Sequence, residues 1–279
     1  MDKIVKKKQG IILIIVLWVM FFLSVVVLVL GAKNRMDIRL RSLSNENLRM
    51  FYLAEEGVSR AIDVLIKDDL QFDALTENWS QNISLKTDQG ILDIQIIDEN
   101  RFININNVSE EILNNIKTLF PEISSEQAQE IIKNRPFNLK SEIIDLLNAD
   151  ALNLTAIQSM QSDLIDMITT LSNGMLNINT ASEKVMLLVP NMSEVAVQSI
   201  IAHRQSSPFM NNDELSSDLS LIGLTPGQIS SLLKCSKIHS NVFRIIVNAQ
   251  SKDKHISRNL EVVVRRQDDK ISVLLFKEN

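Results

Sequence analysis

Residues 11–30 read IILIIVLWVMFFLSVVVLVL and follow the short leader MDKIVKKKQG of residues 1–10. The apolar run contains no charged residue, and Ser24 is its only polar side chain. A helix of these twenty residues is about 30 Å long, at about 1.5 Å per residue, which matches the hydrocarbon core of a bilayer. We therefore predict a membrane-spanning helix over this run.

The leader is basic, with lysines at positions 3, 6, 7 and 8. Basic flanks of a spanning helix stay on the cytoplasmic side of the membrane. Everything after Leu30 should therefore lie across the membrane, and the bulk of the protein is predicted to be exported.

A secretory signal peptide does not account for this amino terminus. Such a peptide has an apolar core of about 7 to 15 residues, followed by a cleavage site of small residues. Here the apolar run is longer, and Gly31 and Ala32 follow it without that pattern. A plain membrane anchor remains an alternative. Gly10 favours another interpretation, because a peptidase that cuts after it removes only the leader and leaves the apolar helix as the new amino terminus.

This layout resembles the type IV prepilin signal, in which a basic leader ends in Gly and the hydrophobic helix follows at once. The resemblance implies cleavage by prepilin peptidase between Gly10 and Ile11, and N-methylation of Ile11. Members of the class usually carry Glu at the fifth mature residue, where this chain has Ile15. The resemblance implies that this Glu neutralises the amino terminus of the subunit above, because an unpaired charge in an apolar core is costly. Ile15 is therefore a marker of a tip position, although a plain anchor would also lack the Glu.

Charge is distributed unevenly along the 279 residues, whose net charge is −5. Residues 101–235 hold eight Lys or Arg against fifteen Asp or Glu, whereas residues 236–279 hold nine against five. The middle of the chain is thus acidic and its end is basic. Cys235 is the only cysteine, so no intramolecular disulfide can form, and a buried thiol is the expected state.

The amino-terminal helix is predicted to continue past the membrane to about Lys67. An apolar stripe recurs at helical spacing beyond Leu40, although Gly57 within it costs about 1 kcal/mol relative to Ala. We expect one small sheet to leave part of this stripe uncovered, so we predict a partner-helix interface there. Its residues are Phe51, Ala54, Val58, Ala61, Ile62 and Leu65.

Short β-branched runs predict strands on both sides of the acidic middle. A hairpin is expected at 83–97, with its turn at Thr87-Asp88-Gln89-Gly90, and three more strands are expected after Ser236. The middle should therefore be inserted into one sheet-containing domain. The predicted division is a leader at 1–10, a transmembrane part at 11–30, a periplasmic helix at 31–70, sheet at 71–101 and 236–279, and an α-helical insertion at 102–235.

The insertion contains an internal repeat. RFININNVSEEILNNIKTLFPEISSEQAQEIIKNRPF, from Arg101, aligns with GMLNINTASEKVMLLVPNMSEVAVQSIIAHRQSSPF, from Gly174. Each copy predicts an extended segment, a helix capped near Asn106 or Asn179, a proline turn, a second helix begun by Ser124 or Ser193, and a Pro-Phe exit. Further helices are expected within Asp150–Leu171 and Ser216–Leu233.

The repeats resemble helix-hairpin-helix units, which raises an alternative function as a membrane-anchored DNA receptor of the competence type. Nucleic-acid-binding hairpins carry glycines whose exposed N–H groups hold a phosphate. The hairpins here, FPEIS and VPNMS, have no glycine, and the domain is acidic. We therefore expect no nucleic acid and interpret the repeats as protein-recognition or scaffolding helices.

No catalytic site is predicted. His203, His239 and His255 have no metal-site spacing, and no nucleophile motif or Gly-rich loop occurs. Asn211-Asn212-Asp213-Glu214 and Asp218 offer oxygen ligands of the kind that Ca²⁺ takes, without the spacing of a known calcium loop. A solvated polar turn is the better interpretation.

Taken together, five features of the chain resemble the K subunit of the type II secretion system. They are the leader, Ile15, the stretch LAEEGVSRAIDVL, the LNINTASEKV motif with its later RQSSPF, and the helical insertion. The resemblance implies an α+β pilin-like fold, with a long amino-terminal helix on a small antiparallel sheet and a large inserted all-α domain. It also implies a non-enzymatic minor pseudopilin of the inner membrane that caps the periplasmic pseudopilus.

The implied partners are the other minor pseudopilins, lettered H, I and J, the major pseudopilin, the prepilin peptidase, and the outer-membrane secretin or cargo. Family members bind calcium, so Ca²⁺ stays open as a cofactor with no ligands assigned.

Overall fold

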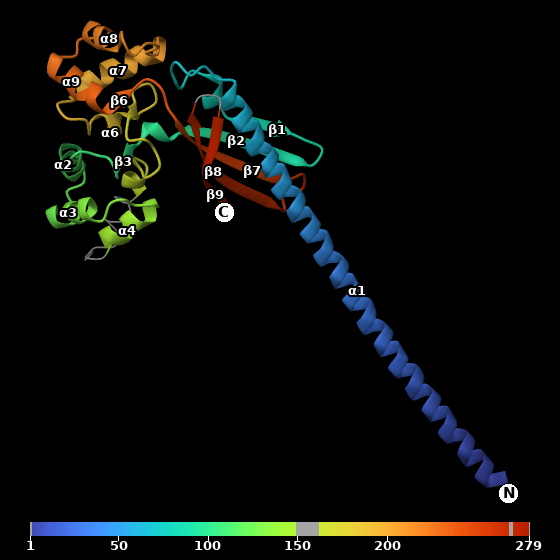
Figure 1. The fold of residues 1–279 in the computed structure, drawn as a ribbon. Coiled ribbons are helices and arrows are strands. Elements are labelled where there is room, and N and C mark those ends of the chain that lie inside the picture. The colour runs from blue at the N-terminus through green and yellow to red at the C-terminus, as the bar shows by residue number, and fades with distance from the viewer. Residues whose placement is uncertain (1, 149–161, 268–269, 279) are drawn as a thin grey trace.

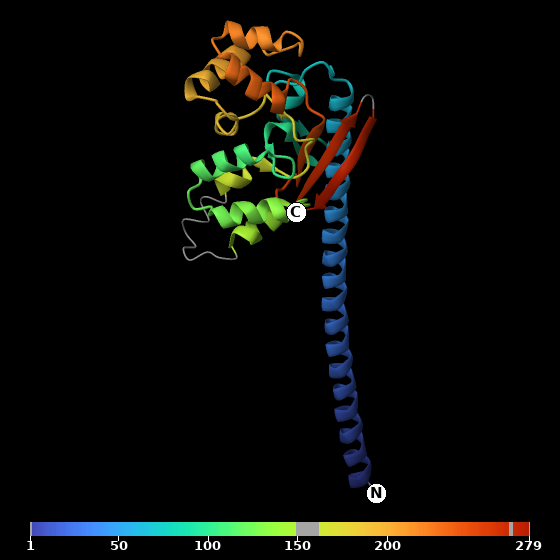
Figure 2. The same cartoon turned by 60° about the vertical axis from the view of Figure 1, so that its left-hand side comes forward.

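One long helix and a globular body at its far end make up the molecule (Figure 1). The computed structural model describes residues 2–148, 162–267 and 270–278. Helix α1, Asp2–Ile66, has 65 residues, and its amino-terminal part projects away from the body, so the amino terminus lies far from every other element (Figures 1 and 2).

The first half of α1 has the surface of a membrane span. Among the described residues, this is the one helix long and apolar enough to cross a membrane. Its side chains from Ile14 to Leu30 are exposed except for the half-buried Val26. Ser24 donates its hydroxyl to the carbonyl oxygen of Met20 at 2.8 Å, so the one polar side chain of the run is satisfied within the helix. Lipid can cover this segment without stranding a polar group.

A five-stranded antiparallel sheet forms one layer of the body, in the order β1-β2-β7-β8-β9. The pairing of β2 with β7 runs from Gly90 opposite Ser251 to Asp98 opposite Phe243, so the two predicted groups of strands meet in one sheet. The strands are β1 Ile83–Lys86, β2 Gly90–Asp98, β7 Val242–Ser251, β8 Ser257–Gln267 and β9 Lys270–Glu278. The fold class predicted from the sequence is confirmed.

The second half of α1 packs across this sheet, as Figure 2 shows. Apolar residues of the helix are buried against alternate residues of the central strands, which is the expected pattern for a half-covered sheet. The predicted partner-helix interface is therefore wrong for most of its residues. Ala54, Val58, Ala61 and Leu65 are buried against the chain's own sheet, and Phe51 and Ile62 are half-buried beside it. The number of strands is the predicted one; the error was to expect that a sheet of five strands would leave the stripe partly uncovered.

Gly57 does not interrupt α1, and the packing explains why glycine stands there. A Cβ at this position would lie 2.6 Å from Cγ1 of Val247 and 3.0 Å from Cδ1 of Leu92. The helix thus lies so close to the sheet at Gly57 that a side chain there would collide with Val247 and Leu92.

We expect Gly57→Ala to lower the free energy of unfolding by about 1 kcal/mol, because overpacking costs about 1 to 3 kcal/mol and the gain in helix propensity returns only about 1. Gly227→Ala is the matched control, since Gly227 also lies in a helix and a Cβ there would meet nothing within 4 Å. Denaturant unfolding of the detergent-extracted protein measures both. A Gly57→Ala protein at least as stable as Gly227→Ala would refute the close approach.

The segment between β2 and β7 forms the helical domain, which lies beside the sheet (Figures 1 and 2). Two short parallel pairs, β3 with β4 and β5 with β6, hold its extended segments together. Its helices are α2 Glu110–Leu119, α3 Ser125–Lys133, α4 Lys140–Asn148, α6 Glu183–Met186, α7 Glu194–Ser206, α8 Leu215–Leu221 and α9 Pro226–Cys235. Its strands are β3 Ile103–Asn104, β4 Ile168–Thr169, β5 Leu176–Asn177 and β6 Ser236–Lys237, and short 3-10 turns stand at Asn78–Ser80 and Glu99–Arg101.

The helix expected within Asp150–Leu171 lies partly outside the described residues. Of the described part, residues 162–165 are helical, whereas Ile168 and Thr169 form β4. The end of this prediction is therefore wrong, because Ile168 pairs with Ile103 of the first repeat and takes up an extended backbone.

Candidate functional site

The two repeats make matching hydrogen bonds. In the first copy, the Asn106 side chain donates to the carbonyl of Phe137 at 2.9 Å and accepts from the N–H of Phe137 at 2.7 Å. In the second copy, Asn179 donates to the carbonyl of Phe209 at 2.9 Å and accepts from its N–H at 3.0 Å. These asparagines bind the Pro-Phe exits and do not cap helices, which corrects one expectation. The first helix of each copy is capped instead by Ser109 or Ser182.

The turns between the paired helices offer no phosphate site. In the first repeat, the backbone N–H of Gln127 donates to the Ser124 hydroxyl at 3.1 Å. The backbone N–H of Ser124 donates to the side-chain oxygen of Gln127 at 2.9 Å. Glu122 and Glu126 lie beside these donors in the sequence and are exposed. Negative side chains there repel a phosphate, so this geometry gives no support to the DNA-receptor alternative.

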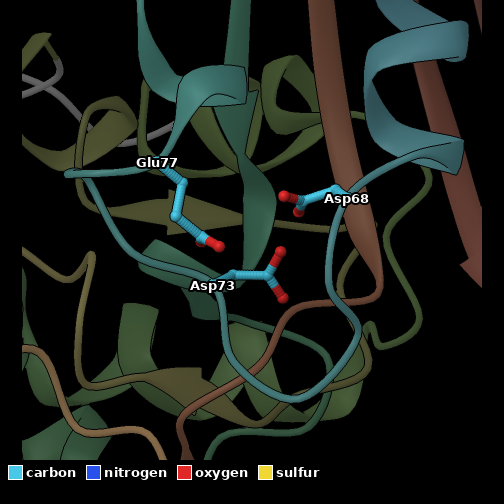
Figure 3. A group of neighbouring side chains, drawn as sticks. All are labelled: Asp68, Asp73 and Glu77. Carbon is cyan, nitrogen blue, oxygen red and sulfur yellow. The ribbon is translucent and has the colours of Figure 1, made fainter.

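Three carboxyl groups gather in the loop that follows α1, and Figure 3 shows Asp68 and Asp73 close together with Glu77 turned toward them. Their oxygen atoms lie within 4.8 Å of one another. Arg266 of β8 binds two of them: Nη1 lies 3.0 Å from Asp68 and Nη2 lies 2.5 Å from Asp73. Glu77 accepts from the N–H of Ala74 at 2.6 Å and from the Trp79 indole at 3.1 Å.

This arrangement does not fit a calcium site. Ca²⁺ takes six to eight oxygen ligands. Here a permanently charged guanidinium already sits between Asp68 and Asp73, and Glu77 is bound to donors of its own loop. A second cation would have to displace Arg266. Among the described residues, this is the one cluster of three or more Asp, Glu, His or Cys ligands.

The residues with oxygen ligands that the sequence analysis weighed for Ca²⁺, and interpreted as a polar turn, are not brought into such a cluster. Asn211, Asn212, Asp213 and Glu214 form an exposed turn before α8, and Asn211 accepts the N–H of Asp213 at 3.0 Å. Asp218 is half-buried one turn further on. The geometry is that of a polar turn.

Asp98, at the end of β2, is the centre of a buried polar junction between the sheet and the second repeat. Its Oδ2 accepts from Thr180 at 2.5 Å, from Ser240 at 2.6 Å and from Asn177 at 3.1 Å, and its Oδ1 accepts from the N–H of Asn100 at 2.7 Å. Asn177 also donates to the carbonyl of Asp73 at 3.0 Å and to Ser240 at 2.8 Å. One asparagine therefore joins the loop after α1, the end of β2 and the start of β7.

Glu99, the next residue, attaches the sheet to β4, which pairs with β3 of the first repeat. Its carboxylate accepts from the hydroxyl of Thr169 in β4 and pairs with Arg244 of β7 at 2.5 Å. Arg244 in turn pairs with Glu261 of β8 at 2.5 Å. The two consecutive acids thus hold one repeat each, which fixes the helical domain on the sheet.

Burial raises the pKa values of Asp98 and of the three carboxyl groups in the loop after α1, Asp68, Asp73 and Glu77. The pKa of Asp73 is raised to about 7 by burial, and the Arg266 charge offsets part of the rise. Burial also raises the pKa of Asp98, against hydrogen bonds from Ser240 and Thr180 that lower it. Asp68 and Glu77 shift in the same direction for the same reason.

The raised pKa of Asp73 predicts that stability falls as pH rises. Its proton is held more tightly in the folded protein, so its contribution to stability is complete below about pH 4 and is lost as pH rises through about 7. We expect Asp73→Asn to flatten the fall in the free energy of unfolding between about pH 5 and pH 8. Asp213→Asn, an exposed carboxyl of the polar turn, is the control. Equal slopes in wild type and Asp73→Asn would contradict the prediction.

The predicted processing residues lie on α1. Gly10 and Ile11 are within its continuous helical backbone, and the side chain of Ile15 is 56% exposed. The structure does not bring them near the junction. Sequence reasoning missed Asp98, Arg266 and Asn177, although the repeated Asn-Ile-Asn pattern was a usable signal for the last of them.

These observations define the class of protein. A long amino-terminal helix, apolar in its first half and packed on an antiparallel sheet in its second, makes a single-pass, membrane-anchored, pilin-like subunit. The helical domain inserted between β2 and β7 sets it apart from a minimal pilin fold.

Comparisons with known proteins agree with this class. The family model "Type II secretion system (T2SS), protein K" matches residues 176–234, which begin at the β5 strand that carries Asn177. A chain in the crystal structure of the GspK-GspI-GspJ complex from enterotoxigenic Escherichia coli matches with a TM-score of 0.64 and 14% identity, over 86% of this chain and 99% of that one. At this identity the structural match shows a shared fold. No curated protein matches.

Residues 176–234 match the protein K family model, and the fold matches that of a chain in the GspK-GspI-GspJ complex, so this chain is similar to the minor pseudopilin K of the type II secretion system. Protein K is a family of structural pseudopilins and not a known enzyme family.

Proposed function

We propose that the chain is the minor pseudopilin that caps the pseudopilus tip and helps to nucleate its assembly for protein export across the outer membrane. The observation that carries the proposal is the rigid attachment of the helical domain to the sheet, through Asp98 and Glu99. The body stands at the end of α1 away from the membrane span (Figure 1). A wide domain held there obstructs the addition of a subunit above it.

The proposed assembly follows from the family. The chain acts without catalysis, in the inner membrane, with its body in the periplasm. Prepilin peptidase cleaves between Gly10 and Ile11. The partners are the H, I and J minor pseudopilins, and the crystallised relative, a complex that contains GspK, GspI and GspJ, supports the last two.

Ile15 supports the tip position, because a tip subunit has no amino terminus above it to neutralise. We expect Ile15→Glu to reduce secretion about tenfold to a hundredfold, since an uncompensated carboxylate in a membrane helix costs about 2.5 to 3.5 kcal/mol. Ile15→Gln has the same size without the charge and should retain most activity. The measurement is the amount of exported protein in the medium. Wild-type secretion by Ile15→Glu would show that the residue carries no information about position.

A further inference from the structure

One edge of the sheet is long and apolar. β9 is the last strand in the order β1-β2-β7-β8-β9, so one side of its backbone has no neighbouring strand among the described residues (Figure 1). It has nine residues, and its stretch 271–276, ISVLLF, contains no charge and no proline. The opposite edge, β1, has only four residues. Proteins usually protect a sheet edge with a short strand, a charge or a proline, so β9 is an unusually open edge.

The register of β9 shows which backbone groups face outward. Arg266 of β8 donates its backbone N–H to the carbonyl of Asn241 at 2.8 Å, on the side of β7. Backbone groups alternate in direction along a strand, so those of Arg265 turn toward β9, where Arg265 stands opposite Ser272. The neighbours of Ser272 therefore turn their N–H and carbonyl groups away from the sheet, and the alternation resumes after the bulge in this ladder. The outward residues are Ile271, Val273, Phe276 and Glu278.

Side chains on the α1 side of β9 are also left half covered. Val273 stands opposite Val264, and Phe276 stands opposite Val262. Both partners are buried in the core beneath α1, whereas Val273 and Phe276 are 57% and 50% exposed. Residues that stand opposite each other in a sheet share one face, so a further strand beside β9 would cover both side chains and extend this core. The alternating donors and acceptors of the edge are matched by another extended backbone.

Lipid does not reach this edge. Glu278, at the end of β9 nearer the membrane span, pairs with Arg258 at 3.0 Å, and Arg258 donates to Asn47 of α1 at 2.9 Å (Figure 2). Asn47 lies about 26 Å beyond Leu30, the end of the apolar run, at about 1.5 Å per residue. The polar layer of a bilayer is only about 5 to 8 Å thick on each side. The occupant of the edge is therefore a polypeptide.

A second copy of this chain does not fit the edge. Two copies that pair their β9 strands antiparallel in one continuous sheet are related by a twofold axis perpendicular to that sheet. Because α1 lies across the sheet in a parallel layer, this axis would reverse the direction of the second α1 (Figure 2). The two membrane spans would then point in opposite directions, although both must enter the same membrane.

We propose that β9 is the docking edge for an extended segment of another protein, which joins the sheet as a sixth strand. The segment is apolar on its α1 side, where it meets Val273 and Phe276. It is polar on its other side, where Ser272 and Lys277 are exposed. Backbone hydrogen bonds provide the affinity, and the apolar side chains select the segment. The inference goes beyond the proposed function, because strand addition at β9 does not depend on a tip position.

Photocrosslinking in membranes that contain the complete secretion system tests the proposal. The full chain carries p-benzoylphenylalanine in place of Phe276, and mass spectrometry identifies the adduct and the crosslinked residues. Ser84, an exposed residue of the opposite edge strand β1, is the control position. We expect position 276 to crosslink to one protein segment that alternates apolar and polar residues, at about five times the yield of position 84 or more.

A pair of substitutions at Val273 tests whether the backbone makes the contact. Val273→Pro removes an outward N–H and leaves the bonds to β8, which is the position in an edge strand where proline is tolerated. Val273→Thr keeps the N–H and the branched shape. In the chain that carries the crosslinker at position 276, we expect Val273→Pro to reduce the yield of the adduct about tenfold, because the loss of one backbone hydrogen bond and the ring together weaken pairing by about 1.4 kcal/mol. Val273→Thr should retain the yield.

Hydrogen exchange of the wild-type chain gives a measurement that needs no variant. In the full chain extracted alone in detergent, the outward amides of Val273 and Phe276 should exchange fast, and the inward amides of Ser272 and Lys277 should exchange slowly. In the complex extracted from membranes with the complete secretion system, the outward amides should slow about tenfold or more, and the inward amides should not change.

Several results would overturn the proposal. They are no adduct at position 276, equal yields at positions 276 and 84, or adducts to phospholipid, to a second copy of this chain or to a helical segment of another protein. Equal yields from Val273→Pro and Val273→Thr would remove the backbone contact. Outward amides that exchange slowly in the chain alone, or equally fast in both preparations, would show that no other protein pairs with β9.

Discussion

Gly10→Val should abolish removal of the leader and, with it, protein secretion. A peptidase that cuts after Gly10 must bring the peptide backbone close to its catalytic groups, and only a residue without a side chain leaves that approach open. Valine places a stiff branched side chain next to the bond to be cut. The unprocessed protein would keep its basic leader, and the helix could not enter the fibre with a free Ile11 at its end. Immunoblots of membrane fractions distinguish the larger, unprocessed form.

Gly31→Val is the matched control. It makes the same substitution in the same helix, just after the apolar run, at a position where a Cβ meets nothing within 4 Å. Processing of this variant should be normal. If Gly10→Val were also processed normally, the prepilin interpretation of the amino terminus would be lost and a plain anchor would remain.

Asn177→Leu should lower the free energy of unfolding by about 3 to 5 kcal/mol. Leucine has a similar volume but removes this donor from the buried carbonyl of Asp73 and from the carboxylate of Asp98, and it removes the oxygen that accepts the buried N–H of Asn179. Each unsatisfied buried polar group costs about 1 to 3 kcal/mol, and more when it is charged. Because Asp73 and Asp98 belong to the sheet side of the junction, we expect the helical domain to loosen first. Limited proteolysis should then release it from the sheet.

Asn104→Leu is the control, because Asn104 is the equivalent residue of the first repeat. Among the described residues, its side chain bonds to the carbonyl of Ser172 and the N–H of Asn106, both within the helical domain. Its loss should cost less, about 1 to 3 kcal/mol, and should leave the two parts joined. If denaturant unfolding showed equal losses for the two variants, the junction would have no special role in attaching the helical domain.

Local patterns explain which parts of the fold could be predicted. The apolar run and its leader required only composition and length, and the hairpin at β1 and β2 followed from alternation and from a turn rich in polar residues and glycine. We could predict that the strands before and after the insertion join in one sheet, because strands on both sides of an acidic, helical middle need a common core. Each of these inferences depends on residues that are near one another in sequence.

The junction could not be predicted in this way. Arg266 and Asp73 are 193 residues apart, and Asp98 and Ser240 are 142 apart. Nothing in the composition of either segment indicates the other. The error over the helix stripe had a different cause. The apolar stripe and the strands were both predicted, but how α1 lies across the sheet, and therefore which of its residues the sheet covers, depends on the packing of the whole fold.

The repeat contains one feature that the sequence predicts and one that it does not. The alignment of the two copies was visible, and matching bonds from Asn106 and Asn179 to the Pro-Phe exits now give it a physical basis. The functional difference between the copies was not visible. Asn177 donates to the carboxylate of Asp98 and to the carbonyl of Asp73, which both lie outside the helical domain, whereas Asn104 donates to the carbonyl of Ser172 within it.

The most direct test of the central claim is the intact mass and amino-terminal sequence of the wild-type protein, extracted from membranes of cells that contain a prepilin peptidase. We expect a chain that begins at N-methylated Ile11 and has lost residues 1–10. That result would establish processing as a pilin-like subunit. A chain that still begins at Met1 would contradict the account, because residues 1–30 would then be an ordinary anchor and the body could not belong to a pseudopilus.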